Sequence, residues 1–313
     1  MPSLDQEILD AICSLTEGGG WLFTVTGTWG SSPRPSGSLL LIDRAGHQTG
    51  SVSGGCVEQD LVERVRAGAF PADRATPLTY GADPDQAARF GLPCGGRLDL
   101  LAEPVLAIDQ WRRLRERVSS RATLERRLCL TTGESSLHPA PAVTAFRYEE
   151  GRILARGFGP AWQLIIIGAG HVARFLTPIA QSLGYRVVIC EPRADQRLGW
   201  DLPDSEVDPG MPDDVVAARA DDPRSAVVAL THDPKLDDLA LMDALKGRAF
   251  YVGALGSRRS QAARRERLLG LGLTPEQVGR LHGPVGLDLG SRTPPEIAVS
   301  IAAELIQVRS GAG

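Results

Sequence analysis

The pattern of apolar and polar residues changes near the middle of this 313-residue chain. In the second half, short apolar runs at 164–167, 185–190, 226–230 and 250–252 predict buried strands. Helical periodicity follows three of these runs, and a last helix is predicted over 294–309. Strands that alternate with helices are typical of a parallel, Rossmann-like sheet.

The first half contains helices and strands without this alternation. Apolar residues at helical spacing predict a helix over 4–15, which ends at three consecutive glycines. In chain order, the further predicted elements are strands over 21–26, 38–42 and 49–52, a helix over 57–67, a strand over 97–102, a helix over 108–118, and strands over 124–130 and 142–148. This mixture predicts an α+β domain.

Charged and glycine-rich residues at 149–152 and 157–160 mark the best position for a domain boundary. We therefore predict an α+β domain over 1–157 and a Rossmann-like domain over 158–313, which makes the fold class α/β. Hydrophobic residues make up 42% of the chain, so each half can form its own core.

The charge and residue composition of the chain limit the classes of partner that it can bind. The chain has 34 Lys and Arg and 38 Asp and Glu, so its formal net charge of −4 provides no basic field for nucleic acid or an anionic membrane. No apolar run reaches the roughly 18 residues of a membrane span, and the first residues lack the basic segment of a signal peptide. The five scattered cysteines favour reduced thiols over disulfides or structural zinc. We therefore expect a soluble, cytoplasmic protein that binds neither nucleic acid nor membrane.

The turn after the first strand of the second half has the features of a dinucleotide-binding fingerprint. Gly168 permits a tight turn, Gly170 lets backbone approach a pyrophosphate, and His171 opens the following helix. Glu191 ends the next strand, where an acidic residue binds ribose hydroxyls. This pattern favours NAD over NADP, although Arg193 could offset the repulsion of a 2′-phosphate. The alternative is a Rossmann-like domain that has kept the turn and lost its nucleotide.

Two histidines follow strands of the same half. His171 lies in the turn itself, and His232 precedes Asp233 and Pro234. Both are expected at the carboxyl ends of strands, where α/β proteins bind ligands. However, an aspartate followed by a proline is also an ordinary signal for the start of a helix, and this explains the second segment without a ligand.

The first half has three glycine-rich loops with polar residues or cysteines. They cover 30–38, 50–58 and 92–96, and two of them contain Cys56 and Cys94. Glycine pairs let backbone and thiol approach a ligand closely, and a helix N-terminus stabilises a thiolate. The alternative is that these cysteines only pack in tight turns, since free cysteine often behaves as a small buried hydrophobe. Packing is a sufficient reason for the other three cysteines, which lie in apolar runs: Cys13, Cys129 and Cys190.

Together with the Gly168 turn and the segments 283–288 and 293–298, the three loops resemble the XdhC/CoxI family. Its members are accessory proteins of xanthine dehydrogenase and related molybdenum hydroxylases, and they have an XdhC/CoxI domain followed by a Rossmann domain. Because the chain has both Cys56 and Cys94, it is similar to the CoxI-like branch of the family, which carries both cysteines. The resemblance covers nearly the whole chain.

The resemblance implies a carrier. Such a protein binds molybdenum cofactor, protects it during sulfuration with a cysteine desulfurase, and inserts it into an apo molybdenum hydroxylase; a homodimer is also expected. Arg34 and glycine-rich backbone suit the cofactor's phosphate, and thiolates suit its soft metal–sulfur centre. We expect the metal at Cys56 and Cys94, and the cofactor-binding residues at Arg34, Ser36, Gly54, Gly55, Cys56, Cys94, Gly95, Gly168, Gly170, His171 and Glu191.

A second hypothesis belongs to another class of protein. The Gly168 fingerprint by itself favours an NAD(P)-dependent oxidoreductase that acts on a small molecule or on the bound cofactor. No acid–base pair is evident in the sequence, which favours a carrier over an enzyme.

Overall fold

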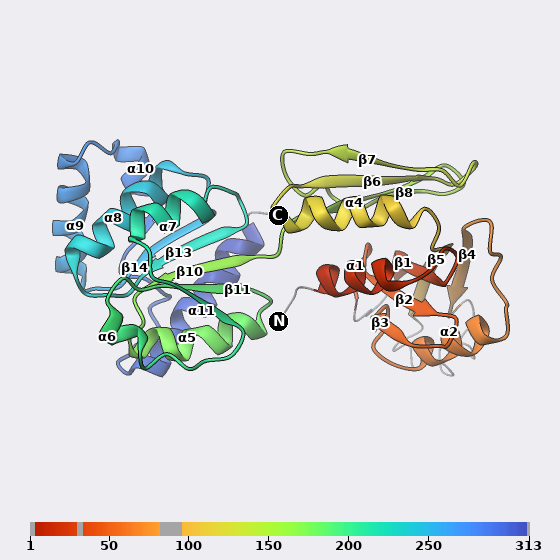
Figure 1. Ribbon diagram of the computed structural model, residues 1–313, viewed down its shortest axis with the longest axis horizontal. Coiled ribbons are helices and arrows are strands. Elements are labelled where there is room, and N and C mark those ends of the chain that lie inside the picture. Colours follow the sequence, from red (N-terminus) through yellow and green to blue (C-terminus); the bar gives the residue numbers. More distant parts are fainter. Residues whose placement is uncertain (1–3, 30–33, 82–95, 312–313) are drawn as a thin grey trace. The chain divides into compact units, whose positions relative to one another are not determined.

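The computed structural model describes residues 4–29, 34–81 and 96–311 (Figure 1). Contacts within the chain divide it into two compact units, Leu4–Pro160 and Ala161–Gly313. The boundary predicted after residue 157 lies three residues before this division. Each unit has its own sheets and its own core, so each is described separately.

The N-terminal unit contains two antiparallel sheets. One has five strands in the order β3-β2-β1-β5-β4, and the other has four in the order β7-β6-β9-β8. Its elements are α1 (Leu4–Ser14), β1 (Gly20–Trp29), β2 (Leu39–Asp43), β3 (Gln48–Gly50), α2 (Cys56–Arg66), β4 (Thr76–Tyr80), β5 (Arg97–Pro104), α4 (Ile108–Ser119), β6 (Leu124–Cys129), β7 (Ser135–Pro139), β8 (Arg147–Glu149) and β9 (Ile153–Phe158).

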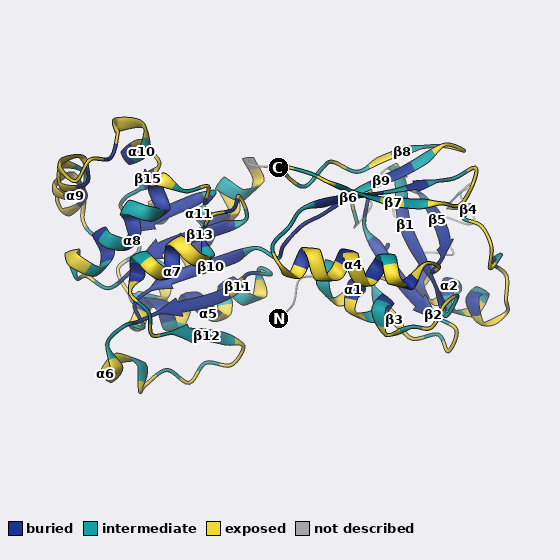
Figure 2. Ribbon diagram, turned by 45° about the horizontal axis from the view of Figure 1, so that its top comes forward, coloured by how far each residue is buried: buried dark blue, intermediate teal, exposed yellow. Residues whose placement is uncertain are grey.

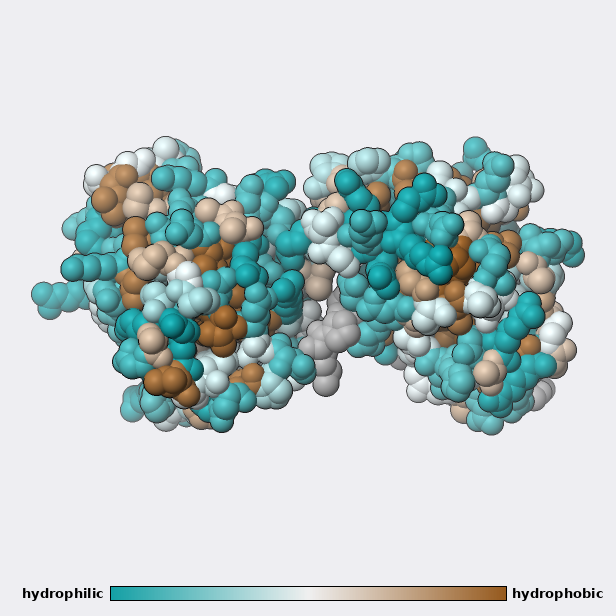
Figure 3. Space-filling model, in the orientation of Figure 1, coloured by the Kyte–Doolittle hydropathy of each residue, from teal (hydrophilic) through white to brown (hydrophobic). Residues whose placement is uncertain are grey.

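Both faces of the five-stranded sheet are buried. Along β1, Phe23 packs with Leu61 of α2 on one face, while Leu22 packs with Ile8 of α1 and Trp111 of α4 on the other. This is the alternation that a strand between two apolar layers requires. Figure 3 draws one side of the molecule, where hydrophilic side chains predominate and apolar residues form separate small patches.

The C-terminal unit is built on a parallel six-stranded sheet in the order β12-β11-β10-β13-β14-β15. Counted from β10, this is the 3-2-1-4-5-6 order of a Rossmann fold, so the predicted fold class is confirmed. Its elements are β10 (Gln163–Ile167), α5 (His171–Ser182), β11 (Arg186–Cys190), α6 (Ala194–Arg197), β12 (Ser205–Asp208), α7 (Pro212–Arg219), β13 (Ser225–Ala229), α8 (Pro234–Lys246), β14 (Tyr251–Ala254), α9 (Arg258–Gly270), α10 (Pro275–Gly279), β15 (Leu281–His282) and α11 (Pro294–Gly311).

The central strands of this sheet are apolar throughout because helices cover both faces. Ile165 of β10 packs in a core with Leu241 of α8, and Ile166 packs in a second core with Leu176 of α5 and Ile301 of α11. Figure 2 shows these strands buried and the outer sides of the helices exposed. Continuous apolar runs are what a parallel sheet covered on both faces requires.

Several short or polar strands do not follow from the apolar pattern. The strand predicted over 142–148 is wrong in extent, because only Arg147–Glu149 forms β8. The structure also has β4, β7, β9, β12 and β15, which the pattern does not predict. Four of these five lie at the ends of their sheets, and an edge strand needs few apolar residues because it has one neighbouring strand and more contact with solvent. The exception is β9, an interior strand that lies between the two segments interpreted as the domain boundary.

A buried ionic network joins α8 to α9. The guanidinium of Arg264 donates from Nη2 to Asp237 at 3.0 Å and from Nε to Asp238 at 3.2 Å, and all three side chains are buried. Arg267 donates to the other oxygen of Asp238 at 2.7 Å, but its own side chain is 43% exposed. The network therefore contains one buried and one partly exposed cation that share an acceptor.

These two arginines give a matched test of the network. We expect Arg264→Met to lower the free energy of unfolding by about 3–5 kcal/mol, because the buried Asp237 loses its cation and the buried Asp238 keeps only the partly exposed Arg267. We expect Arg267→Met to lower it by about 1 kcal/mol or less, because its ion pair is partly solvated. Urea unfolding of the full chain, followed by tryptophan fluorescence, measures both. Equal destabilisation by the two variants would contradict a buried network centred on Arg264.

Candidate functional site

Described parts of two predicted loops, and both ends of the segment that contains the third, lie at one end of the five-stranded sheet. Strands β1, β3 and β4 end at Trp29, Gly50 and Tyr80, and strands β2 and β5 begin at Leu39 and Arg97. Because neighbouring strands are antiparallel, these five termini lie at the same end. Residues 34–38 and 51–55 connect to strands there, and Gly81 and Gly96 flank the segment that contains Cys94.

The first loop leads into β2 through a tight turn. Arg34 is partly buried and Ser36 is exposed. Gly37 has a φ of +87°, and its carbonyl accepts a hydrogen bond from Nε of Arg156 at 2.8 Å. A Cβ at this glycine would lie 3.1 Å from the Phe146 side chain, so the turn is packed closely against its neighbours.

The buried Glu58 side chain holds the second loop in place through hydrogen bonds to its backbone amides. Its carboxylate accepts hydrogen bonds from the amides of Gly54 at 2.8 Å and Gly55 at 2.9 Å, and also from the amides of Val52 and Ser53. Burial disfavours ionisation, but the hydrogen bonds from Ser53, Gly54 and Gly55 outweigh it and lower the pKa of Glu58 to about 2. The two glycine amides expected to hold a cofactor phosphate are therefore already engaged by this carboxylate.

The same arrangement leaves Cys56 at the surface. Glu58 stands at the third position of α2 and accepts the amide of the residue before the helix, which is one half of a capping box. Cys56 is the first residue of α2 and is exposed. Apart from the immediate chain neighbours, no atom of the described residues lies within 4 Å of a Cβ placed at Gly54 or Gly55. Cys94 and Gly95 lie outside the described residues.

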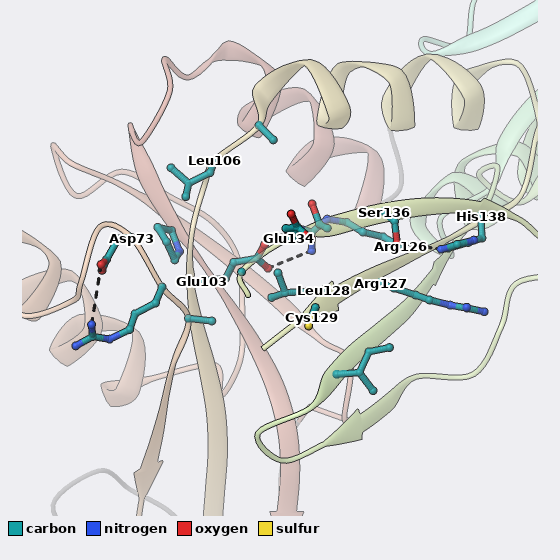
Figure 4. Close-up of a pocket in the computed structure, with 17 residues that line it drawn as sticks. Asp73, Glu103, Leu106, Arg126, Arg127, Leu128, Cys129, Glu134, Ser136 and His138 are labelled. Carbon is teal, nitrogen blue, oxygen red and sulfur yellow. Dashed lines mark hydrogen bonds and ion pairs between the residues drawn. The ribbon is translucent and has the colours of Figure 1, made fainter. Parts of the chain in front are cut away.

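A third thiol lies in a cavity of about 640 Å³ that is lined by residues of β5, β6 and β7 (Figure 4). Cys129 ends β6, and its Sγ is 3.0 Å from Oγ1 of Thr131. Hydrogen bonds from the side chains and amides of Thr131 and Thr132 lower the pKa of this thiol to about 6. Burial instead raises the pKa of Cys190 to about 12. Cys129 lies in a strand as expected, but unlike Cys190 it is partly exposed and sits where the strand meets its hairpin turn.

The wall of this cavity includes a buried ion pair. The guanidinium of Arg126 donates to both carboxylate oxygens of Glu103, and its carbon atom lies 4.1 Å from the centre of the Trp111 ring. Figure 4 shows this pair beside Cys129, with Arg127 and His138 further along the hairpin. The pair links the two sheets of the unit, which is a structural role.

The glycine turn of the C-terminal unit lies at the switch point between β10 and β13. Gly168 has a φ of +102°, and a Cβ there would lie 2.9 Å from Cγ2 of Thr231, so both its conformation and its surroundings require glycine. Gly170 precedes α5, and His171 is its exposed first residue. The sequence therefore predicts this turn and its helix correctly.

Glu191 is arranged differently from the expectation. Oε1 accepts the amide and Nε of Arg193 at 3.1 and 2.8 Å, and Oε2 accepts the amide of Ala169 at 3.1 Å and Nη2 of Arg193 at 2.8 Å. Four donors fill the four acceptor positions of a carboxylate. The residue is also fully buried. In this structure Glu191 therefore offers no acceptor to ribose hydroxyls, and it positions Arg193 and the turn instead.

A cavity of about 600 Å³ occupies the crevice at this switch point. His171 and His232 line it together with Arg193 and Arg292, and none of the described residues that line it is Asp or Glu. His232 has a left-handed backbone with φ of 63°, and Asp233 caps α8 by accepting the amide of Lys235 at 2.9 Å. The helix-start interpretation of Asp233 is confirmed, and the sequence did not indicate that Arg292 reaches this crevice.

Two further findings concern metal and membrane. Among the described residues, no group of three or more His, Cys, Asp or Glu side chains could hold a metal ion. A site made of Cys56 and Cys94 is not tested by this finding, because Cys94 lies outside that part of the chain. In residues 4–29, 34–81 and 96–311, no helix is long and apolar enough to span a membrane.

Comparison with known proteins relates both units to one family. A family model described as "XdhC and CoxI family" matches residues 16–81, and one described as "XdhC Rossmann domain" matches residues 164–305. The molybdenum cofactor insertion chaperone PaoD of Escherichia coli (strain K12) is 28% identical over 93% of this chain and 84% of its own. A protein of Bacillus subtilis (strain 168) described as a probable xanthine dehydrogenase subunit is 25% identical over 92% of each chain.

A solved structure extends this similarity to the fold. The crystal structure of a protein described as a xanthine dehydrogenase from Bacillus halodurans superposes with a TM-score of 0.76 and 26% identity, covering 99% of this chain and 96% of that one. The family matches fall in both units and in the order expected from the sequence. The chain belongs to the XdhC and CoxI family.

Proposed function

We propose that this protein binds molybdenum cofactor as cargo and inserts it into an apo molybdenum hydroxylase. The observation that carries the proposal is that the loops of Arg34 and Cys56 adjoin neighbouring strands at the same end of the five-stranded sheet. The relative described as a molybdenum cofactor insertion chaperone, which aligns along nearly the whole chain, supports the same proposal.

The chemistry of the loops suits the two ends of this cargo. Cys56 presents an exposed thiol at the start of α2, and thiolates are soft ligands for a metal–sulfur centre. Cys94 is the second proposed ligand. Arg34 is the proposed partner of the cofactor phosphate, because the amides of Gly54 and Gly55 already donate to Glu58. The two glycines, Ser36 and Gly95 are then proposed to line the site, where their small side chains let the backbone come close to the cargo.

The proposal includes the partners of a carrier. The recipient is a hydroxylase of the xanthine dehydrogenase or carbon monoxide dehydrogenase type. A cysteine desulfurase supplies sulfur while the carrier protects the cofactor, and the carrier acts as a homodimer in the cytoplasm. The descriptions of the relatives support a molybdenum enzyme as the recipient. The desulfurase, the homodimer and the cytoplasmic location are what the family resemblance implies.

An NAD(P)-dependent oxidoreductase is the second candidate. The order of the parallel strands and the crevice at Gly168, Gly170 and His171 favour it. The engaged carboxylate of Glu191 weighs against NAD held in the usual pose. Incubating protein loaded with oxidised molybdenum cofactor, which can accept the two electrons of a hydride, with NADH or NADPH separates the two candidates. Cofactor-free protein is the control without an acceptor. Oxidation of the reduced nucleotide by the loaded protein beyond this control favours the enzyme, and its absence favours the carrier.

Thiol ligation is tested by three serine variants. We expect Cys56→Ser and Cys94→Ser to lower the molybdenum retained after anaerobic purification by about tenfold, because serine keeps the size but removes the soft ligand. Cys129→Ser is the matched control, since Cys129 is a partly exposed thiol of another cavity, and we expect full retention. Elemental analysis and activation of an apo-hydroxylase are the measurements. Full retention by both loop variants would show that thiol ligation is wrong.

Phosphate recognition is tested at Arg34. A hydrogen bond to a charged group contributes about 1.5–3 kcal/mol, so we expect Arg34→Ala to weaken binding of released cofactor by about tenfold or more. Added inorganic phosphate is expected to compete less well against this variant than against the parent. Arg152→Ala is the control, because Arg152 is an 80% exposed arginine paired with Glu149. Unchanged affinity and competition in Arg34→Ala would place the phosphate elsewhere.

A further inference from the structure

The cavity beside Cys129 lies away from the loops of the proposed cargo site. It has a volume of about 640 Å³, which is enough for a small organic ligand. Its lining includes Glu103 and Pro104, the last residues of β5. The loops of Arg34 and Cys56 instead adjoin the end of the sheet where β5 begins. The cavity is therefore a candidate site for a separate ligand.

The thiol of Cys129 is the reactive group of this cavity. Cys129 is partly exposed and lines the cavity where β6 ends. Oγ1 of Thr131 lies 3.0 Å from Sγ, and the hydroxyls and amides of Thr131 and Thr132 donate hydrogen bonds to the sulfur. These donors stabilise the thiolate and lower the pKa of Cys129 to about 6. An accessible thiolate is the nucleophile of thiol–disulfide exchange.

A buried arginine in the same cavity has an unused hydrogen-bond donor. Arg126 is 4% exposed and lines the cavity. Its Nη1 and Nη2 donate to Glu103, but its Nε has no hydrogen-bond partner among the described residues. Buried donors in folded proteins are nearly always paired, because leaving one without an acceptor is costly. This observation is independent of Cys129 and points to a ligand that has an acceptor such as a carboxylate.

Charged side chains of both signs lie at separate positions along the cavity. Figure 4 shows Asp73 at one end, Arg127 and His138 at the other, and Cys129 between them. Glu134, in the hairpin turn after β6, adds a further carboxylate to the lining. A ligand with carboxylates alone, or with ammonium groups alone, complements only part of this lining. A molecule that has both, such as an amino acid or a short peptide, complements all of it.

We infer that this cavity binds a low-molecular-weight disulfide of the amino-acid or peptide class and that Cys129 forms a mixed disulfide with one half of it. The thiolate Sγ attacks one sulfur of the ligand, a bond forms between these two sulfurs, and the disulfide bond of the ligand breaks. The other half leaves as a thiolate with the electron pair, so the ligand itself is the oxidant. The inference does not depend on the carrier role of the Arg34 and Cys56 loops.

Incubation of the full chain with glutathione disulfide, followed by mass spectrometry of the intact chain and its peptides, tests the inference. We expect a glutathionyl group on Cys129 and its loss in Cys129→Ser. The uncharged bis(2-hydroxyethyl) disulfide is the comparison, and each rate is divided by the rate with the urea-unfolded chain. We expect this normalised rate to be at least about tenfold higher for glutathione disulfide, because charge-assisted contacts hold its ends. Equal normalised rates, or an unmodified Cys129, would overturn the inference.

The contribution of the charged lining is tested at Arg127. We expect Arg127→Gln to lower the normalised rate with glutathione disulfide by about fivefold, because a partly solvated ion pair is lost, and to leave the rate with the uncharged disulfide unchanged. Arg112→Gln is the control, because Arg112 is a 57% exposed arginine that pairs with Asp109 and does not line the cavity. Circular dichroism checks that both variants keep the fold. An unchanged rate in Arg127→Gln, or an equal loss with both disulfides, contradicts recognition by this lining.

Discussion

Backbone amides in a glycine-rich loop need acceptors, and in both units of this protein a buried glutamate supplies them. Glu58 accepts hydrogen bonds from the amides of residues 52–55, and Glu191 accepts them from the amides of Ala169 and Arg193. Each carboxylate stays ionised because its hydrogen bonds outweigh the effect of burial on its pKa. The shape of both candidate sites depends on these two internal anions.

The internal anions change how an external anion can be held. A phosphate and a buried carboxylate both accept hydrogen bonds from backbone amides. The amides that already donate to Glu58 and Glu191 are therefore not available to a ligand. In the proposed carrier role, recognition of the cofactor phosphate in the N-terminal unit is therefore assigned to the Arg34 side chain. The glycines remain necessary because Gly54 and Gly168 have positive φ angles and lie where the chain must turn sharply.

The cysteines show how position within an element decides the chemistry of a thiol. Cys190 ends a central strand of a parallel sheet, and burial raises the pKa of its thiol. Cys129 also ends a strand, but that strand belongs to a hairpin whose turn supplies hydrogen-bond donors to sulfur. Cys56 begins a helix and is exposed. The sequence already separates the first two in part, since an apolar run precedes Cys190 and two arginines stand close before Cys129. The hairpin turn at Cys129 separates them further.

The sequence by itself determined the two-part organisation, the Rossmann fold of the second half and the turn at Gly168, because these follow from local periodicity and from backbone needs of single glycines. It also indicated the loops of Arg34, Cys56 and Cys94. The tertiary structure decided that Glu58 engages the amides of Gly54 and Gly55. Whether Glu191 meets ribose or Arg193, and whether Arg292 reaches the crevice, depends on partners distant in the chain and on competition for hydrogen bonds. Such competition is settled only when the elements pack together.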